Sequence, residues 1–452
     1  MTTPWKIGMF QSAMLMGSWR LPENTSTDFL DLAHWIDMAK RCEAAGVDFL
    51  FLADDYGYPV VNDTIPPAAI RNGIQTPKAD PSMILPALAA VTERLGLVTT
   101  LSTSVEKPPM VARKMATLDH LTKGRIGWNI VTGAGQNASA RLFGAPMVEH
   151  DRRYEIATDH VELSLKLWEG CWDDDAIVLD REAGVYADPA KVREIEHDGP
   201  HFRSKGLLNV PPGPQRTPML FQAGASGPGR DLAAKYAEGV FLAAEVSAMT
   251  EQISDMRRRA TEFGRDAQSI KFLMAGTFIV APTSEEAHQL RARQIATRTL
   301  DEAAASYSFY TGVDLSVMDP DKPIDPSTVT ETGRTNLERF LGPNAPTVRE
   351  VLEEFQRNSV MGAPFIGDPG EVVDQAEAAM AATGADGFLV QPDATGTFDS
   401  FLELVMPELR ARGLVVEPQV GETLRGRIRG DGRARLAPDH PGARIWEAAS
   451  LV

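Results

Sequence analysis

Short apolar segments alternate with longer amphipathic segments along most of this 452-residue chain. The short segments are nearly continuous runs of apolar residues, which is typical of parallel strands buried on both faces. The expected strands are 6–11, 47–53, 97–102, 125–131, 219–222, 239–243, 270–279 and 387–390. The expected helices are 29–45, 82–95, 110–121, 153–172, 230–236, 250–263, 284–305 and 400–412. Eight strand–helix pairs, with no GxGxxG turn after the first strand, predict an α/β fold: a (β/α)8 TIM barrel rather than an open dinucleotide-binding sheet.

Three long segments interrupt this alternation and predict insertions in the barrel. They span about residues 56–81, 172–218 and 307–364 and carry Pro, Gly or acidic clusters. Connections this long in a compact protein are usually lids or binding loops, and we expect the first and third to be lids. The barrel with its insertions would occupy residues 1–415. Residues 416–452 would form a C-terminal tail packed on the body or on a second subunit.

Composition and charge argue against several classes of protein. The formal net charge is −17 and no run of basic residues is present, so neither nucleic acid nor an anionic membrane is an expected partner. No apolar stretch approaches the roughly 20 residues that cross a bilayer, and the first residues do not resemble a signal peptide, so we expect a cytoplasmic protein. The two cysteines and eight histidines show no disulfide framework and no metal-binding spacing, so no metal is expected.

Polar residues follow the expected strands at their carboxyl ends, where the active-site mouth of a TIM barrel lies. The segment ATLDHLTKGRIGWNIVT, residues 116–132, runs from a helix through a Lys-Gly turn into a strand and ends with Asn129 and Thr132 in such positions. The Asn129 side chain offers both a donor and an acceptor. In the preceding strand, alternation places Thr100 on the same side as Ser102. These groups favour hydrogen bonds to an uncharged polar ligand, although Thr and Ser are common on any strand.

Two further strand ends offer a carboxylate and an aromatic ring. The second strand ends in Asp54 and Asp55, and because adjacent strand residues point to opposite faces, only one carboxylate is expected to face the mouth. The other would cap a helix or lie in a solvated loop. Phe10, at the end of the first strand, would form an apolar wall of the mouth or, equally, part of the core.

The segment AGASGPGR, residues 223–230, lies between an expected strand and an expected helix. Glycines and a serine at such a turn expose several backbone N–H groups beside the positive end of the helix dipole, which is a cradle for phosphate. Ser226 would donate its hydroxyl, Gly227 its backbone amide, and Arg230 a positive charge. The alternative is a glycine-rich turn selected for tight geometry.

The segment EHDRRY, residues 149–154, begins the fourth expected helix. His150 and Tyr154 are four residues apart and therefore share one helix face. Together they could donate two hydrogen bonds to an anionic group. Taken alone, the pair is more often a helix cap followed by a core tyrosine.

Many segments, in the same order, resemble the bacterial luciferase-like flavin-dependent monooxygenases, in particular the nitrilotriacetate and dibenzothiophene-sulfone monooxygenase branch. Besides residues 116–132 they are TERLGL, KLWEGCWDDDA, DPAKV, GDPGEVVDQ and VMPELRARGL. Two segments depart from the pattern: QSAMLMGS at 11–18, where many relatives carry histidine, and KPPM at 107–110, where an aromatic residue is common. Both lie where substrate pockets form, so the resemblance does not supply the substrate.

The resemblance implies a two-component enzyme that binds FMN noncovalently at the barrel mouth. Reduced FMN would come from a separate NAD(P)H-dependent flavin reductase and would react with O2, so that a small organic substrate is oxygenated, with possible cleavage of a C–S, C–N or C–halogen bond. A homo-oligomer is expected. The implied FMN-binding residues are Asp54, Thr100, Asn129, His150, Tyr154, Ser226 and Gly227. No catalytic residue is assigned, and the candidates in the pocket are Phe10, Asn129 and His150.

Several alternatives stay open at the level of sequence. The same barrel could be a deazaflavin- or flavin-dependent reductase or dehydrogenase, or a flavin-binding protein without catalysis. A glycosidase using Asp54 and the acidic run 173–175 would need two carboxylates across a cleft. The apolar loop 58–74 favours a neutral substrate such as a thioether, a sulfone or an aromatic compound. Arg20 and Arg71 keep a polycarboxylate possible.

Overall fold

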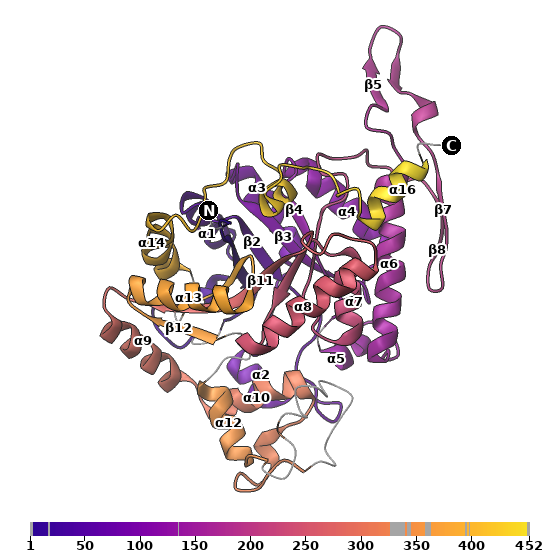
Figure 1. The fold of residues 1–452 in the computed structure, drawn as a ribbon. Helices are drawn as coiled ribbons and strands as arrows, with labels where there is room; N and C mark the ends of the chain where they lie inside the picture. Colours follow the sequence, from indigo (N-terminus) through magenta and orange to yellow (C-terminus); the bar gives the residue numbers. More distant parts are fainter. Residues whose placement is uncertain are drawn as a thin grey trace.

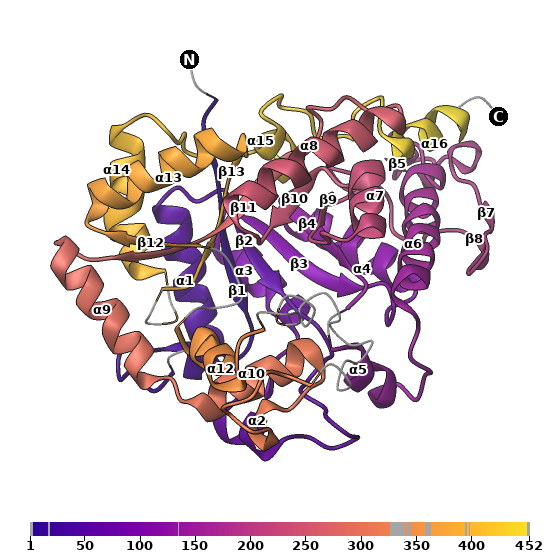
Figure 2. The ribbon, with the colours of Figure 1, turned by 60° about the horizontal axis from the view of Figure 1, so that its bottom comes forward.

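The computed structural model describes residues 3–16, 19–133, 135–325, 340, 345–357, 363–393, 396 and 398–449. Within them, eight parallel strands form a closed barrel surrounded by helices (Figure 1; Figure 2). The strands are β1 (Lys6–Ser12), β2 (Phe49–Ala53), β3 (Gly96–Ser102), β4 (Ile126–Val131), β9 (Met219–Gln222), β10 (Gly239–Leu242), β11 (Lys271–Val280) and β13 (Gly387–Gln391). Each pairs with the next in this order, and β13 pairs with β1 to close the ring. The predicted (β/α)8 TIM barrel is confirmed.

A helix after each barrel strand covers the outside of the barrel. These helices are α1 (Leu32–Ala44), α3 (Leu85–Val91), α4 (Pro108–Leu121), α6 (His150–Gly170), α7 (Gly227–Tyr236), α8 (Val246–Glu262), α13 (Pro369–Thr383) and α14 (Met406–Ala411). The expected helices omitted α13, although its start carries a readable signal. Asp368 accepts a hydrogen bond from the Glu371 backbone N–H, and the Glu371 side chain accepts one from the Asp368 N–H, a capping box followed by a proline at the first turn.

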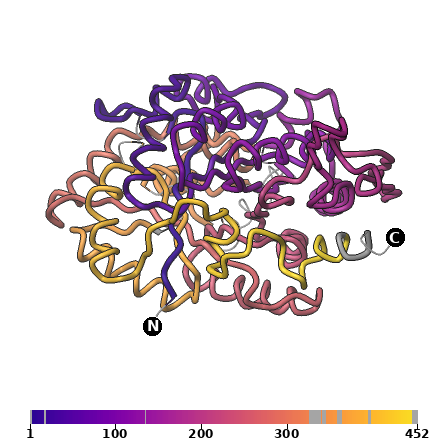
Figure 3. The backbone as a smooth tube through the Cα atoms, turned by 90° about the horizontal axis from the view of Figure 1, so that it is seen from above, coloured from indigo at the N-terminus to yellow at the C-terminus, as the bar shows by residue number. Residues whose placement is uncertain are grey.

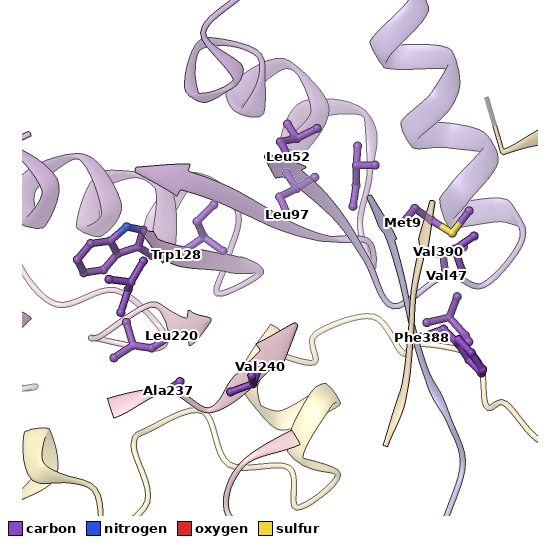
Figure 4. Packing of buried hydrophobic residues seen from close by; sticks show 14 of the residues in the cluster. Met9, Val47, Leu52, Leu97, Trp128, Leu220, Ala237, Val240, Phe388 and Val390 are labelled. Carbon is purple, nitrogen blue, oxygen red and sulfur yellow. The ribbon is translucent and has the colours of Figure 1, made fainter. Parts of the chain in front are cut away.

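Alternation along the strands divides the apolar side chains between two cores. One core lies between strands and helices, and Figure 4 shows several of its members, including Leu52, Leu97, Trp128 and Phe388. The other lies inside the barrel and is dominated by phenylalanines; its buried members are Phe49, Phe51, Val98, Met219, Phe221, Phe241, Leu273, Ala275, Leu389, Leu424 and Ile428. Successive residues of β2 thus point alternately inward and outward, as the pleat requires.

Four helices contribute to a cap over the carboxyl end of the barrel: α2 (Pro67–Asn72), α9 (Ser284–Thr297), α10 (Leu300–Thr311) and α12 (Val348–Arg357). In Figure 2, α2, α10 and α12 lie together at the bottom, and α9 runs toward them along the left side. The single helix expected over 284–305 is wrong, because the chain leaves helical geometry at Arg298 and Thr299. The Thr299 side chain accepts a hydrogen bond from the Glu302 N–H and so starts a new helix. Helix α10 packs against α2 and α12, and α10 and α12 share a small apolar cluster that includes Tyr307 and Phe355.

A further strand and two hairpins complete the insertions. Strand β12 (Ala363–Gly367), which the sequence did not predict, pairs with the carboxyl half of the long strand β11, outside the barrel ring. The hairpins β5–β6 (Ile177–Asp180 and Val185–Ala187) and β7–β8 (Ile195–Asp198 and Arg203–Gly206) belong to the second insertion. In Figure 1, β7–β8 lies beside α6, and β5–β6 extends away from the barrel above it. Helix α5 (Gln136–Leu142) lies in the connection between β4 and α6.

The C-terminal segment packs against the amino-terminal end of the barrel. It contains α15 (Leu424–Arg429) and α16 (Pro441–Ala449), and in Figure 3, where it is yellow, it passes the N-terminal strand and reaches the side of the molecule where α6 lies. Leu424 and Ile428 enter the apolar core inside the barrel. The barrel interior is therefore closed at this end. None of the helices in the described residues has the length and hydropathy that a bilayer crossing requires.

Candidate functional site

A cavity of about 370 Å³ opens at the carboxyl ends of β1, β2, β11 and β13. Ser12, Ala53, Thr277 and Gln391 line it from these four strands. Its opposite wall comes from the cap, that is from the segment after α2 and from residues of α9, α10 and α12. The strand ends form one wall of the cavity and the cap forms the other. A ligand in this cavity would therefore be enclosed between the barrel and the inserted helices.

Phe10 stands between the core inside the barrel and this cavity. Its ring lies 5.9 Å from that of Phe51 and 6.0 Å from that of Phe241, both in stacked orientation, and it also lines the cavity. The two roles considered from sequence, apolar wall and core residue, are both present. Phe10 therefore supplies a flat apolar floor whose position is fixed by the rings beneath it.

Asp54 and Asp55 both line the cavity, so the expectation that only one of them faces the mouth is wrong. The strict alternation of a strand does not apply to them because β2 ends at Ala53. Asp55 forms an ion pair with Lys78, with 3.0 Å between Oδ2 and Nζ, and accepts a hydrogen bond from the Gly57 N–H. Burial raises the pKa of Asp54 from 3.8 to about 7, with the positive charge of Lys78 opposing the shift.

Thr100 and Asn129 meet inside the barrel at the ends of β3 and β4. They are register partners, and Asn129 Nδ2 donates to Thr100 Oγ1 over 3.0 Å. Both side chains are buried, yet Asn129 Oδ1 has no hydrogen-bond partner. An orphaned buried acceptor costs free energy unless a ligand or water satisfies it, so this amide is available to a bound donor.

The turn between β9 and α7 forms a cradle with the start of α6. Ser226 is the N-cap of α7 and accepts a hydrogen bond from the Gly229 N–H, while the space around Gly227 is open. A Cβ on Gly224 would lie 2.8 Å from the Tyr154 hydroxyl, so this turn is in close contact with that tyrosine. The His150 ring lies 5.2 Å from the Tyr154 ring. The two motifs predicted separately from sequence thus meet at one place.

Other charged residues near these motifs are arranged differently from expectation. Arg230 does not offer a free positive charge to the cradle, because its guanidinium pairs with Asp255 at 3.1 Å and donates to the Ala225 carbonyl. His150 Nδ1 contacts Asp151 Oδ1 at 2.7 Å. Arg153, which sequence reasoning missed, has a buried Nε without a partner. Burial lowers the pKa of Arg153, and that cost would fall if an anion were bound nearby.

The predicted residues therefore fall into three groups at the carboxyl end of the barrel. Phe10 and Asp54 line the cavity, Thr100 and Asn129 are buried inside the barrel mouth, and the remaining four form the cradle: His150, Tyr154, Ser226 and Gly227. The sequence did not single out Lys78, Gln222 or the arginines of α9. Gln222 ends β9, and its side-chain oxygen Oε1 accepts a hydrogen bond from the Gly224 N–H at 2.7 Å, which shapes the cradle.

Arg20 and Arg71, which in the sequence were candidates for binding a polycarboxylate substrate, both form ion pairs. Arg20 pairs with Glu302 at 2.5 Å, and Arg71 pairs with Asp301 at 2.7 Å. These contacts join the segment after β1 and helix α2 to helix α10, so they hold the cap together. Among the described residues, no group of three or more His, Cys, Asp or Glu side chains could hold a metal ion.

The profile of the luciferase-like monooxygenase family matches residues 12–387. The chain is 36% identical over 437 residues to dimethyl-sulfide monooxygenase of Hyphomicrobium sulfonivorans, covering 96% of this chain and 91% of that protein. It is 38% identical to long-chain alkane monooxygenase of Geobacillus thermodenitrificans, covering 96% of each. The chain belongs to the luciferase-like monooxygenase family and is an oxidoreductase of the flavin-dependent monooxygenase class.

Comparison with solved structures also finds flavin-dependent relatives. A riboflavin lyase, crystallised with modified FMN and riboflavin, superposes with a TM-score of 0.92 at 41% identity, covering 98% of this chain and 99% of that one. The relatives also include dibenzothiophene-sulfone monooxygenase and nitrilotriacetate monooxygenase component A, which confirms the resemblance noted in the sequence.

Proposed function

We propose that this protein is the oxygenating component of a two-component monooxygenase. It would take reduced FMN from a separate NAD(P)H-dependent flavin reductase, use O2, and transfer one oxygen atom to a small organic substrate held in the cavity. The observation that carries the proposal is the convergence of three groups of ligand-ready residues at one end of the barrel: the cradle, the buried amide of Asn129, and the cavity floor of Phe10 and Asp54.

The residues present fit FMN in charge, shape and hydrogen bonding. The cradle supplies a helix amino terminus, the open backbone at Gly227 and the hydroxyls of Ser226 and Tyr154, all of which suit a phosphate. The unpartnered Asn129 Oδ1 suits a donor of the ribityl chain or the ring edge. The stacked phenylalanine rings under Phe10 suit the flat face of an isoalloxazine.

Bound reduced FMN would supply the oxygen-activating chemistry, and the protein would orient it and keep water away. The Ser226 hydroxyl and the Gly227 N–H would hold the phosphate while His150 and Tyr154 donate hydrogen bonds to it. Asp54, with a pKa of about 7, could hold or release a proton at its carboxyl within the cavity near neutral pH. The cap formed by α2, α9, α10 and α12 would shield the substrate from solvent.

The test combines a binding measurement with an isotope measurement. The purified chain is titrated with FMN by fluorescence, then given enzymatically reduced FMN and ¹⁸O2 with dimethyl sulfide, an alkane, dibenzothiophene sulfone and nitrilotriacetate in turn. We expect FMN binding and one ¹⁸O atom in a product from at least one substrate class. Binding of FMN with hydrogen peroxide as the sole product across a broad substrate panel would instead favour a non-catalytic flavin-binding protein. Failure to bind FMN, with binding of a deazaflavin, would favour the reductase alternative.

A second candidate is oxidative breakdown of riboflavin itself. It is favoured by the riboflavin lyase, whose structure superposes over nearly the full length of both chains. The ring faces of riboflavin are flat and apolar, as the Phe10 floor of the cavity is. Loss of added riboflavin that depends on both reduced FMN and O2, followed by chromatography, separates this candidate from the oxygenation of other substrates.

A further inference from the structure

Helix α9 brings two arginines to the cap side of the cavity. Arg291 lies within α9 and Arg298 is the residue that ends it, and both line the cavity together with Gln294 and Gln356. Arg291 and Arg298 are seven residues apart, which is close to two helical turns, so they lie on the same side of the helix. Their position is opposite the strand ends, where Phe10 and Asp54 lie.

Neither guanidinium is neutralised by a described carboxylate. Arg291 donates to Gln294 Oε1 at 2.5 Å and to the Arg357 carbonyl, while Arg298 makes one long hydrogen bond of 3.5 Å, to the Gln356 carbonyl. The buried Nε of Arg298 has no partner. The other cation of the cavity wall, Lys78, is by contrast paired with Asp55 at 3.0 Å. Within the described part of the chain, this end of the cavity thus carries uncompensated positive charge.

The surroundings make that charge costly until an anion binds. Burial lowers the pKa of both guanidiniums, and the charge of Arg298 lowers the pKa of Arg291 further. Glu302 is the nearby carboxylate that acts on Arg298, but it is bound to Arg20 at 2.5 Å. Asp54 and Asp55 line the cavity from the strand ends. Glu302 also lines the cavity, from α10, but it is paired with Arg20. The two arginines are therefore the cations of the cap that no carboxylate in the described residues pairs with.

We propose that Arg291 and Arg298, helped by the Gln294 and Gln356 side chains, form an anion subsite that binds a carboxylate or sulfonate of the substrate. Guanidinium groups bind such planar or tetrahedral oxyanions through charge-assisted hydrogen bonds. The apolar body of the substrate would then lie across the cavity, and the atom to be oxygenated would face the barrel mouth. The assignment of a substrate class rests on the proposed function; the existence of the subsite does not. The apolar loop 58–74 favoured a neutral substrate, whereas this subsite favours an acidic one.

The test compares two probes of nearly equal shape by calorimetry on the full chain without flavin. They are para-(methylsulfanyl)benzoate and the neutral para-(methylsulfanyl)benzamide. We expect the wild-type protein to bind the benzoate at least about 10-fold more tightly, as two charge-assisted hydrogen bonds would give. Arg298→Gln and Arg291→Gln should each remove most of this preference, and Arg298→Lys should keep part of it.

Arg293→Gln is the matched control because Arg293 lies on the same helix but is exposed and paired with Glu23. It should leave the preference for the benzoate unchanged, and near-ultraviolet circular dichroism should show that every variant is folded. Equal affinity of the wild-type protein for both probes would overturn the proposal. So would an unchanged preference in the folded Arg298→Gln and Arg291→Gln variants, or an equal loss of preference in Arg293→Gln.

Failure of the subsite and failure of the proposed function give different results. If the anion subsite is absent, FMN titration and ¹⁸O incorporation into a neutral substrate remain as proposed. If the chain does not bind FMN but still prefers the benzoate through Arg291 and Arg298, the subsite stands and the monooxygenase assignment fails.

Discussion

Two buried polar clusters at opposite ends of the barrel differ in how completely their atoms are hydrogen-bonded. At the amino end, Arg425 of the C-terminal segment is completely buried and donates to both carboxylate oxygens of Glu238 at 2.7 and 2.9 Å, and to the Thr217 and Pro218 carbonyls. Although burial alone would raise it, the charge of Arg425 holds the pKa of Glu238 below its usual range. At the carboxyl end, Asn129 Oδ1 is left without a partner and burial raises the pKa of Asp54 to about 7.

This difference separates the groups that stabilise the fold from those that serve function. Satisfied buried charges contribute to a defined closed end, and breaking such a pair is strongly destabilising. Unsatisfied groups destabilise the protein and are tolerated where a ligand completes them. The comparison predicts that changes at the amino end alter stability alone, and that changes at the carboxyl end alter ligand binding or the pH dependence of stability.

The largest effect is expected at the closed end. Arg425→Met leaves Glu238 buried without its partner and should lower the free energy of unfolding by about 3–5 kcal/mol, measured by chemical denaturation. FMN affinity per folded molecule should be unchanged. Arg433→Met, on the same segment but exposed, should change stability by no more than about 0.5 kcal/mol. A loss of FMN affinity in folded Arg425→Met would show that the two ends are coupled.

Asp54→Asn tests how much the buried carboxylate at the carboxyl end of the barrel lowers the free energy of unfolding. Because the folded-state pKa of Asp54 is raised from 3.8 to about 7, its contribution to stability is fully present below about pH 4 and is lost as the pH rises through 7. The variant should therefore match the wild-type protein at pH 4 and exceed it above pH 7 by up to about 4 kcal/mol. Free energies of unfolding of both proteins, measured from pH 4 to above pH 7, test this difference. A difference that does not change with pH would contradict the raised pKa.

Ser226→Asp places a negative charge in the cradle while keeping a residue that can cap α7. We expect FMN to bind about 100-fold more weakly or worse, equivalent to about 2.7 kcal/mol, because the carboxylate repels the phosphate. Fluorescence titration measures it. Thr299→Asp, the same kind of change at the N-cap of α10, should leave FMN affinity unchanged. Unaltered FMN affinity in Ser226→Asp would show that the phosphate does not bind at this turn.

His150→Ala should have the smallest effect. Losing one hydrogen bond to a charged group should weaken reduced-FMN binding by about 1–3 kcal/mol, measured anaerobically. The control is His120→Ala, because His120 lies near the carboxyl end of α4 and contacts the Pro211 carbonyl. If affinity holds while turnover disappears, His150 takes part in the chemistry rather than in holding FMN.

Much of this arrangement was predictable from local sequence. The eight barrel strands follow from their apolar runs, and the cradle follows from glycines at a strand–helix turn, because both signals lie within a few neighbouring residues. The capping box of α13 was also readable but was not used. The break between α9 and α10 was hidden because residues 284–305 favour helix throughout, and only the Thr299 cap divides them.

What the sequence alone determined is the barrel, the order of its eight strands and the chemistry available at the strand ends. What only the tertiary structure decided is which distant groups meet: Arg20 and Arg71 were bound to carboxylates on α10, while Arg291 and Arg298 were left facing the cavity. The physical reason is the distance along the chain over which each interaction acts. Strand and turn preferences act between neighbours in the chain, whereas the charge left over in a cavity depends on which side chains from separate elements are close enough to neutralise one another.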